Sequence, residues 1–463
     1  MTLVMPTRIL IVGRGAREHA LAWKLAAEPG VNEVVVAPGS DAIATEPRVR
    51  CVPGVDTLDV AAVVAIARRE AVELVVVGPE DPLAAGIADA LTDAGFPVFG
   101  PTAAAARIES SKAFCHEIAA AAGVRMARAG SFADAAEAVA FARELAAGGR
   151  GVVVKADGLA AGKGVTVCDS VADAERAIGE LEGSPGGRAG GAGSASGAWV
   201  VVEERLAGRE ASLIALCDGV RAVALPFARD HKRLLDGDAG PNTGGMGAYS
   251  PLPDLPDEAA EALLAAFHRP ILAELARRGT PFRGALYVGL MLTEDGPVAL
   301  ECNARFGDPE AQAILPRLAV ALGPILLAAA RGDLTAALTG PLLADGHLPT
   351  LPGAAVAIVL AAAGYPDAPR SGDRIEGLDD ARATGALVFH AGTARDADGT
   401  FRTTGGRLLT VVGRGADLAA ARAAATTAAD RIHARGLQRR HDIAAATATD
   451  PAEMIEIAGA LAG

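Results

Sequence analysis

The chain has 463 residues, of which 51% are hydrophobic, so it is long enough to bury the cores of about two to four domains. Its formal net charge of -13 argues against a general nucleic-acid-binding protein. No run of about eighteen apolar residues predicts a transmembrane helix, residues 1–7 show no signal-peptide pattern, and the five cysteines form no close pairs. We therefore expect a cytoplasmic monomer with no membrane or nucleic-acid partner.

The first part of the chain alternates between short apolar runs and helical segments, and most of the apolar runs end in Gly-rich or acidic turns. This alternation predicts a doubly wound α/β domain with a parallel sheet over residues 1–106, whose ligands would bind at the carboxyl ends of the strands. The sequence predicts strands at 8–12, 33–36, 74–77 and 98–99, and helices at 17–27, 58–69 and 82–94.

Beyond this domain the pattern is more mixed, and a Gly/Ser-rich stretch at 183–197 predicts a mobile loop. We expect a linker at 331–352 and a small α+β domain at 353–463. The elements expected in the central region are helices 112–122 and 257–277, strands 151–155, 165–168, 199–203 and 211–217, and a polar loop at 229–248. Those expected in the C-terminal domain are strands 354–362, 386–391 and 407–412 and an Ala-rich helix at 416–435.

The turn after the first strand carries Gly13 and Gly15, a spacing that suggests dinucleotide binding. However, Glu18 stands in place of the third glycine, and no ribose-binding acid ends the second strand, which makes a nicotinamide-dependent oxidoreductase a weak alternative. The remaining interpretation is a turn that presents backbone N–H groups and a helix N-terminus to an anion, with Arg17 and His19 in the first helical turn. A purely structural turn explains the pattern equally well.

A second Gly-rich segment, residues 158–164, lies between two expected strands. It is not a Walker A loop, because its spacing is one residue short and no Ser or Thr follows Lys163. Its glycines allow the backbone to approach phosphates closely, and Lys155 at the end of the preceding strand can place a compact positive charge on a phosphate oxygen. The strand at 199–203 then ends in Glu203 and Glu204, whose neighbourhood suits either an adenine-binding hinge or a plain acidic strand end.

The polar loop combines a charged cluster, Asp230 to Arg233, with a glycine-dense turn, Asn242 to Gly247. Basic side chains and glycine backbone together suit an anionic substrate. Long ordered loops of this polarity are usually functional.

The most informative stretch is 296–310, where an apolar strand ends in Glu301, Cys302 and Asn303. Because side chains alternate across a strand, Glu301 and Asn303 point to one face and Cys302 to the other. A carboxylate and an amide oxygen on one face form half of a Mg²⁺-type site. Arg305 and Asp308 follow at once. Solvated polar residues at a strand end are the alternative reading of this stretch.

Taken together, these segments resemble those of the glycinamide ribonucleotide synthetases (phosphoribosylamine–glycine ligases), a family of ATP-grasp enzymes, over nearly the whole chain. The segments that carry the resemblance are 13–23, 77–83, 99–102, 111–114, 155–164, 230–233, 240–251 and 301–310. The last three are highly specific within the ATP-grasp superfamily.

The resemblance implies a central ATP-grasp domain of two subdomains at 107–330, with a lid-like subdomain at about 125–200, between the doubly wound domain and the α+β domain. It implies a ligase that activates glycine with ATP as glycyl phosphate, which the amine of 5-phosphoribosylamine then attacks in the second step of purine synthesis. ATP as co-substrate and Mg²⁺ or Mn²⁺ would be required.

The resemblance also assigns roles to individual residues of this chain. The ATP-binding residues it implies are Lys112, Lys155, Gly162, Lys163, Gly164, Glu203, Glu204, Leu206 and Glu210. The metal ligands are Glu301 and Asn303. The catalytic residues are Arg305 and Asp308, which would neighbour the glycyl phosphate, and Lys155. The residues that would enclose glycine and phosphoribosylamine are Gly13, Gly15, Arg17, Glu18, His19, Glu80, Asp230, Lys232, Arg233, Asn242, Thr243, Gly244, Gly245, Met246 and Gly247.

Two further readings stay open. Another ATP-grasp carboxylate–amine ligase, acting on bicarbonate, formate or a different carboxylate, would share the fold and the ATP-binding residues. The second is a non-catalytic nucleotide sensor. The presence of Glu301 and Asn303 beside both lysines argues against the sensor.

Overall fold

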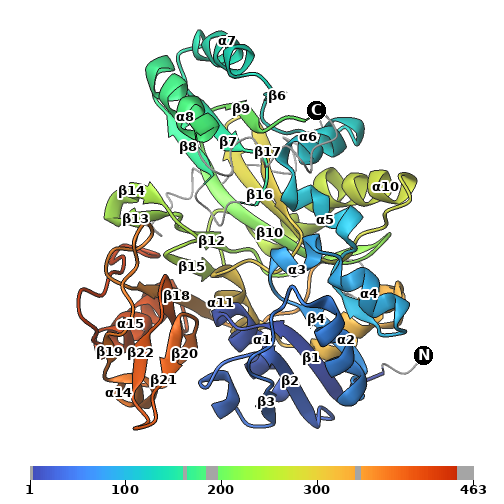
Figure 1. The fold of residues 1–463 in the computed structure, drawn as a ribbon, viewed down its shortest axis with the longest axis vertical. Coiled ribbons are helices and arrows are strands. Elements are labelled where there is room, and N and C mark those ends of the chain that lie inside the picture. The colour runs from blue at the N-terminus through green and yellow to red at the C-terminus, as the bar shows by residue number, and fades with distance from the viewer. Residues whose placement is uncertain (1–3, 160–163, 184–196, 339–345, 446–463) are drawn as a thin grey trace.

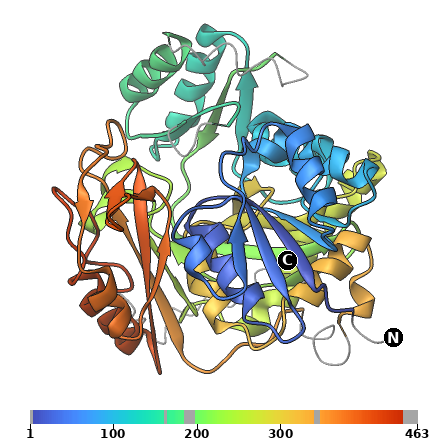
Figure 2. The ribbon, with the colours of Figure 1, turned by 60° about the horizontal axis from the view of Figure 1, so that its bottom comes forward.

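The computed structural model describes residues 4–159, 164–183, 197–338 and 346–445. Figure 1 shows the N-terminal domain at the bottom, long central strands above it, a small subdomain at the top and the C-terminal domain at the lower left. Figure 2, turned by 60°, shows the red C-terminal strands beside the blue N-terminal domain, while the green subdomain stands apart from both. Within the described ranges, no helix is long and apolar enough to cross a membrane.

The N-terminal domain is a parallel sheet covered by helices, as the alternating pattern predicts. Its strand order is β3-β2-β1-β4-β5, and every neighbouring pair is parallel. The central strand β1 is buried from Ile9 to Val12, because helices cover both faces of such a sheet. The strands are β1 (Arg8–Gly13), β2 (Glu33–Pro38), β3 (Val49–Cys51), β4 (Leu74–Val77) and β5 (Val98–Phe99). The helices are α1 (Ala16–Ala26), α2 (Val60–Arg69), α3 (Glu80–Ala84), α4 (Ile87–Asp93) and α5 (Ala103–Ser110).

The single helix expected at 82–94 is wrong, since the structure has α3 and α4 there. Gly86 separates them with a φ of +86°, a left-handed conformation that ends a helix.

The subdomain at the top of Figure 1 is an antiparallel sheet in the order β6-β9-β7-β8, with two helices on one face. It has its own hydrophobic core, which includes Trp199, Val152 and Ile178. Its elements are β6 (Ala129–Phe132), α7 (Ala135–Ala146), β7 (Val152–Ala156), β8 (Val165–Cys168), α8 (Val171–Gly183) and β9 (Val200–Glu204). The sequence analysis did not anticipate β6, α7 or α8. Most of the stretch expected to be mobile, 184–196, lies outside the described residues.

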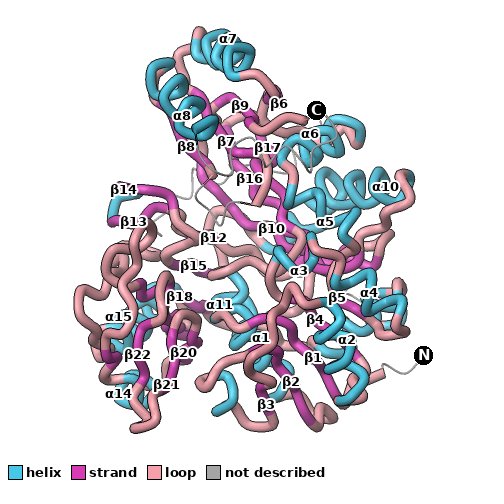
Figure 3. The backbone as a smooth tube through the Cα atoms, in the orientation of Figure 1, coloured by secondary structure: helices cyan, strands magenta, loops and turns pink. Residues whose placement is uncertain are grey.

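A longer antiparallel sheet, β11-β10-β16-β17, forms the centre of the molecule, as Figure 3 shows. In β17, Ala299 and Glu301 pair with consecutive residues of β16, so Leu300 is an extra, bulged residue. The strands are β10 (Arg209–Asp218), β11 (Ala222–Ala224), β16 (Arg283–Thr293) and β17 (Gly296–Asn303). The helices around this sheet are α6 (Lys112–Ala121), α9 (Ala260–Leu263), α10 (Arg269–Arg277), α11 (Glu310–Ile314) and α12 (Gly323–Arg331).

The C-terminal domain contains a five-stranded sheet in the order β12-β15-β18-β23-β20. Two of its strands come from the segment expected to be a polar loop, so that expectation is wrong: residues 229–250 form four short strands. The strands of the sheet are β12 (Arg229–Asp230), β15 (Gly247–Ser250), β18 (Ala354–Ala361), β20 (Leu387–His390) and β23 (Arg407–Gly415). The remaining elements are β13 (Arg233–Leu235), β14 (Ala239–Asn242), β19 (Arg374–Ile375), α14 (Leu378–Ala383), β21 (Thr393–Arg395), β22 (Phe401–Thr403) and α15 (Leu418–Ala429).

The segment expected to be a linker is attached to the central region where it is described. His347 forms a bridge with Ala224 of β11, and Thr350 forms one with Leu318. Residues 339–345 lie outside the described part of the chain.

The helix expected at 257–277 is interrupted by a π-helical turn, Leu264–His268, between α9 and α10. This turn places His268 against the central sheet, where the side chain is completely buried and Nε2 lies 3.0 Å from the Leu286 carbonyl oxygen. Burial lowers the pKa of His268 to about 4.

This burial predicts a loss of stability in acid. Because the pKa of His268 is lower in the folded state, the unfolded chain binds a proton more readily, so the contribution is complete above about pH 6.5 and declines toward pH 4. Between pH 7 and pH 5, we expect the free energy of unfolding of the parent to fall by about 2 kcal/mol more than that of His268→Gln. Urea denaturation at both pH values measures this, with His433→Gln as the exposed control. Equal pH dependence in the parent and His268→Gln would contradict the assignment.

Candidate functional site

Lys155 joins the small subdomain to the central sheet. It lies at the end of β7, and its Nζ is 2.7 Å from Glu203 Oε2 and donates to the Leu300 carbonyl oxygen at 3.0 Å. Because Leu300 is the bulged residue of β17, its carbonyl is free to accept this side-chain bond. The lysine therefore reaches the same strand end that carries Glu301.

Lys112 approaches the same region from the N-terminus of α6. Its backbone N–H donates to Asp157 Oδ1 at 2.6 Å, and its Nζ donates to the Gly158 carbonyl oxygen at 2.9 Å. Burial, together with the nearby charge of Lys155, lowers the pKa of Lys112. Of the described ends of the Gly-rich loop, Gly158 thus contacts Lys112, and the Gly164 carbonyl accepts from the Ala156 backbone N–H at 2.7 Å. Gly162 and Lys163 lie outside the described residues.

Glu203 is 2% exposed, and its carboxylate serves the protein itself. Oε2 pairs with Lys155, and Oε1 lies 2.8 Å from Nε2 of His116, a residue that the sequence analysis missed. Burial by itself would raise the pKa of Glu203, but Lys155 and His116 outweigh it and the pKa is lowered. The neighbouring Glu204 accepts from the Arg128 backbone N–H at 2.8 Å. Both side chains are thus bonded within the protein, and the hinge continues to the partly exposed Leu206.

Glu301 and Asn303 are both partly exposed on one face of β17, while Cys302 between them is buried, as strand alternation predicts. Glu301 lies across Gly289 of β16, where an added Cβ would come within 3.2 Å of the Glu301 Cγ. Lys232 Nζ lies 3.3 Å from Glu301 Oε1 and 3.0 Å from Glu210 Oε2.

Charge rather than exposure keeps Glu301 ionised. Lys232 lowers its pKa most, burial opposes this, and Lys155 and Lys112 add to the effect, so that the pKa is about 2. Glu301 is therefore an ionised carboxylate that contacts Lys232 and lies near the charges of Lys155 and Lys112, which come from other elements.

Further acidic and hydroxyl groups surround Lys232. Burial raises the pKa of Asp230, which Lys232 partly counteracts. The Ser212 hydroxyl lies 3.1 Å from Glu310 Oε1 and 3.1 Å from the Tyr287 hydroxyl. Ser212 and Tyr287 had no distinctive sequence signal, because single polar residues in apolar strands are common.

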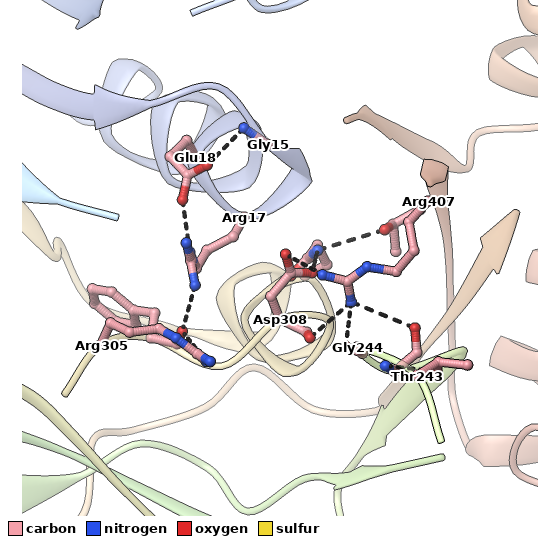
Figure 4. A network of polar contacts seen from close by, with 12 residues as sticks. Gly15, Arg17, Glu18, Thr243, Gly244, Arg305, Asp308 and Arg407 are labelled. Carbon is pink, nitrogen blue, oxygen red and sulfur yellow. Dashed lines mark hydrogen bonds and ion pairs between the residues drawn. The ribbon is translucent and has the colours of Figure 1, made fainter. Parts of the chain in front are cut away.

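Arg305 follows β17 and is enclosed by acids from the N-terminal half of the chain. Its Nε lies 3.2 Å from Glu80 Oε2, and its Nη2 lies 3.1 Å from Glu109 Oε1. Burial would raise the pKa of Glu80, but Arg305 and Arg17 lower it overall. Figure 4 shows Arg17 and Arg305 on either side of the backbone after β17, where each donates to the Phe306 carbonyl oxygen at 3.2 Å.

The turn after β1 encloses the carboxylate of Glu18. Glu18 Oε2 accepts from the Gly15 backbone N–H at 2.6 Å, and Oε1 accepts from Arg17 Nε at 2.6 Å. A Cβ on Gly78 would come within 2.2 Å of Glu18 Oε1, and one on Gly13 within 2.6 Å of its Cγ. The glycines therefore make room for this carboxylate, which explains why the third position of the expected motif is Glu.

His19 faces the C-terminal domain. It is 1% exposed, its Nε2 lies 3.1 Å from Glu46 Oε1, and its Nδ1 accepts from the His390 backbone N–H at 2.9 Å. Both ring nitrogens are thus occupied, and burial lowers the pKa of His19. The contact makes His19 a positioning residue between two domains rather than a direct substrate ligand.

The glycine-dense turn does not offer its N–H groups to an anion, contrary to the expectation from its composition. The backbone N–H of Gly244 donates to the Tyr365 hydroxyl at 3.1 Å, that of Gly245 to Thr243 Oγ1 at 3.0 Å, and that of Met246 to the His231 carbonyl at 2.8 Å. These groups are occupied within the protein.

The two ends of this turn are also held. Asn242 Nδ2 donates to the Val165 carbonyl of the small subdomain at 3.1 Å, and Gly247 begins β15. Arg233 Nη1 donates to the Gly240 carbonyl at 2.7 Å, so Arg233 closes its own hairpin. Only Lys232 of the basic cluster is directed at Glu301.

Three family models match consecutive parts of the chain. They describe the N domain (residues 7–109), the ATP-grasp (A) domain (110–311) and the C domain (355–446) of phosphoribosylglycinamide synthetase. The chain belongs to this family. The predicted architecture, a doubly wound domain followed by an ATP-grasp domain and an α+β domain, is confirmed, and the chain is an ATP-dependent ligase of purine biosynthesis.

Individual relatives agree with this assignment. The chain is 48% identical over 424 residues to a phosphoribosylamine–glycine ligase of Phenylobacterium zucineum, covering 92% of this chain and 95% of the relative. It is 47% identical over 448 residues to that of Streptomyces coelicolor, covering 95% and 99%. The crystal structure of the Thermotoga maritima phosphoribosylamine–glycine ligase is 33% identical, covers 94% of this chain and 100% of its own, and has a TM-score of 0.73.

A more distant structure shares the fold alone. The biotin carboxylase domain of Hydrogenobacter thermophilus 2-oxoglutarate carboxylase, determined with MgADP, ADP and bicarbonate, is 18% identical with a TM-score of 0.66, covering 94% of this chain and 92% of that one.

A substitution of Lys155 tests whether this lysine contributes to ATP binding. Because a hydrogen bond to a charged group contributes about 1.5–3 kcal/mol, we expect Lys155→Met to weaken ATP binding about 10- to 100-fold. Glu203 keeps His116 as a partner, so the fold should persist. Calorimetric titration with ATP measures the change, and the control is Lys24→Met, whose Nζ donates instead to the Leu318 carbonyl at 2.9 Å. Unchanged ATP affinity in Lys155→Met would exclude this role.

Proposed function

We propose that the chain joins glycine to 5-phosphoribosylamine at the expense of ATP, giving glycinamide ribonucleotide, ADP and phosphate. The observation that supports this site is Glu301, an ionised carboxylate that contacts Lys232 and lies near the charges of Lys155 and Lys112. Phosphoryl transfer needs charge neutralisation and positioning more than a covalent nucleophile, and this arrangement supplies both.

The reaction has two steps. The glycine carboxylate attacks the γ-phosphate of ATP, which forms glycyl phosphate and releases ADP. The amine of phosphoribosylamine then attacks the acyl carbon, and phosphate leaves as the amide forms. Lys112 and Lys155 hold the ATP phosphates, the backbone from Glu203 to Leu206 contacts adenine, and Glu210 accepts from the ribose hydroxyls.

The residues at the end of β17 fit a hard divalent cation. Glu301 is ionised, and Asn303 supplies an amide oxygen on the same face; Mg²⁺ commonly uses one or two protein ligands and completes its shell with phosphate and water oxygens. Mg²⁺ or Mn²⁺ would bind here, and when bound it neutralises charge on the β- and γ-phosphates.

The remaining predicted residues enclose the other substrates. Arg305 neighbours the glycyl phosphate, and its charge is already balanced by Glu80 and Glu109. Asp308, which pairs with Arg407, neighbours the glycyl phosphate as well. The residues that line the substrate side are Gly13, Gly15, Arg17, Glu18, Glu80, Asp230, Lys232 and the segment 242–247, with Arg233 and His19 acting through the elements they hold. Cytoplasmic location and a monomeric state stay predictions.

The substrate assignment is tested by ADP release. We expect release with ATP and Mg²⁺ only when glycine and freshly prepared phosphoribosylamine are both present, and a product that contains one glycyl group. Release with bicarbonate or formate in place of glycine would keep the ATP-grasp chemistry and overturn the substrate assignment. ATP binding without release under any condition would favour a sensor.

The metal assignment is tested by Glu301→Gln. Because the amide removes the permanent charge but keeps the shape, we expect turnover to fall at least about 100-fold, with weaker Mn²⁺ binding measured by electron paramagnetic resonance. Glu294→Gln in the exposed turn between β16 and β17 is the matched control and should leave both unchanged. Near-normal Mn²⁺ affinity in Glu301→Gln would contradict the assignment.

A further inference from the structure

Arg407 is the first residue of β23 in the C-terminal domain, and its guanidinium reaches into the site from there. Nη2 lies 2.9 Å from Asp308 Oδ2, and Nη1 donates to the Asp308 carbonyl oxygen at 2.9 Å. Nη1 also donates to the carbonyl oxygens of Gly244 and, at 3.4 Å, Gly245. Figure 4 shows this guanidinium between the turn that carries Asp308 and the turn that carries Thr243 and Gly244. One side chain therefore bonds two segments that are distant in the sequence.

Glycine at positions 244 and 245 leaves room for the contact of this turn with Arg407 and with the segment that carries Asp308. A Cβ on Gly244 would come within 3.3 Å of the Arg407 Cζ, and one on Gly245, whose φ is +104°, within 2.5 Å of the Pro309 Cδ. The turn thus lies flat against both Arg407 and the residue after Asp308. Close packing, rather than an anion cradle, accounts for these two glycines.

A second residue of the C-terminal domain holds the same turn. The Tyr365 hydroxyl accepts from the Gly244 backbone N–H at 3.1 Å, while Arg407 donates to the Gly244 carbonyl. Both polar groups of Gly244 are therefore bonded to the C-terminal domain. Tyr365 and Arg407 come from different segments of that domain, so the attachment does not depend on one local loop.

Both carboxylate oxygens of Asp308 are bonded within the protein. Oδ1 accepts from Gln312 Nε2 at 2.7 Å, and Oδ2 pairs with Arg407. A bidentate set of contacts from a planar guanidinium sets orientation as well as distance, which a lysine cannot reproduce.

We propose that Arg407 is a positioning residue of the ligase reaction, which fixes Asp308 and the Gly244–Gly245 turn relative to each other and so makes the C-terminal domain a working part of the glycine side of the site. This inference rests on the proposed function for its kinetic consequences, because it assumes that Asp308 and the turn border glycine and its phosphate.

Loss of Arg407 should affect the kinetic constants for ATP and for glycine differently. The ATP-binding elements bond to other partners: Lys155 to Glu203 and Leu300, and Lys112 to Asp157 and Gly158. Loss of Arg407 leaves these contacts in place. The KM for ATP should therefore change little, whereas kcat/KM for glycine should fall about 100-fold, a loss typical of a small misplacement of reacting groups.

The experiment compares Arg407→Ala, Arg407→Lys and Tyr365→Phe with Arg414→Ala, an exposed arginine on the same strand. We expect the loss in kcat/KM for glycine to be largest in Arg407→Ala, smaller in Arg407→Lys, smaller still in Tyr365→Phe and absent in Arg414→Ala. Millimolar guanidinium, far below denaturing concentrations, should partly restore Arg407→Ala. A rise in the KM for ATP as large as the loss in kcat/KM for glycine, or normal kinetics, would overturn the proposal.

Hydrogen exchange gives a second readout that does not depend on the reaction. The backbone N–H groups at 243–246 should be protected in the parent and in Arg414→Ala, and should exchange at least about 10-fold faster in Arg407→Ala, in line with the loss of at least about 1.4 kcal/mol of local stability. Unchanged exchange would overturn the positioning role even if the parent enzyme proved inactive with glycine. An inactive parent with faster exchange in the variant would instead refute the proposed function alone.

Discussion

The site is organised around one electrostatic constraint, the negative charge of Glu301 at the bulged end of β17. A partly buried carboxylate that stays ionised must be compensated by cations, and isolated charges are costly to bury. The compensating cations come from elsewhere: Lys232 next to β12, Lys155 from β7 and Lys112 from α6. Because each lysine belongs to a different element, the charge balance also holds those elements around the strand end. The bulge contributes directly, since the carbonyl of Leu300 accepts from Lys155.

The basic side chains assigned to the site are of two kinds, lysines and arginines. The lysines of the chain are Lys24, Lys112, Lys155, Lys163 and Lys232, and all but Lys24 belong to segments assigned to the site. A compact ammonium suits phosphate oxygens, whereas a planar guanidinium suits fixed contacts to carboxylates and carbonyls. Arg17, Arg305 and Arg407 each bond a carboxylate and a backbone carbonyl. Lys155 makes the same two kinds of contact, to Glu203 and Leu300. Under the proposed function, Lys112 and Lys155 would in addition meet the phosphate oxygens of ATP.

Sequence reasoning succeeded where a short-range rule applies. Strand alternation placed Glu301 and Asn303 on one face with Cys302 opposite, and the alternation of strands and helices predicted the parallel N-terminal sheet. It failed where the hydrogen-bond partner of a group is distant in the sequence. Glycine content suggested an anion cradle at 244–246, but Tyr365 and Arg407 occupy or crowd that backbone from more than a hundred residues away in the chain. Nothing local distinguishes an N–H that is free from one that a distant hydroxyl accepts.

The same long-range connection blurs the border between the catalytic and C-terminal domains. After β11 the chain leaves the central sheet, contributes β12 and β15 to the C-terminal sheet, and only then returns through α9 and α10 to β16. β15 pairs with β18 from Gly247 to Ser250, so the segment that carries Lys232 and the glycine turn is built into the C-terminal sheet at both ends. His19, whose ring accepts from the His390 backbone, ties that sheet to the N-terminal domain as well. A substrate bound beside Asp308 would thus meet groups whose positions depend on all the domains at once, because no one domain holds Lys232, Arg305 and Arg407 by itself.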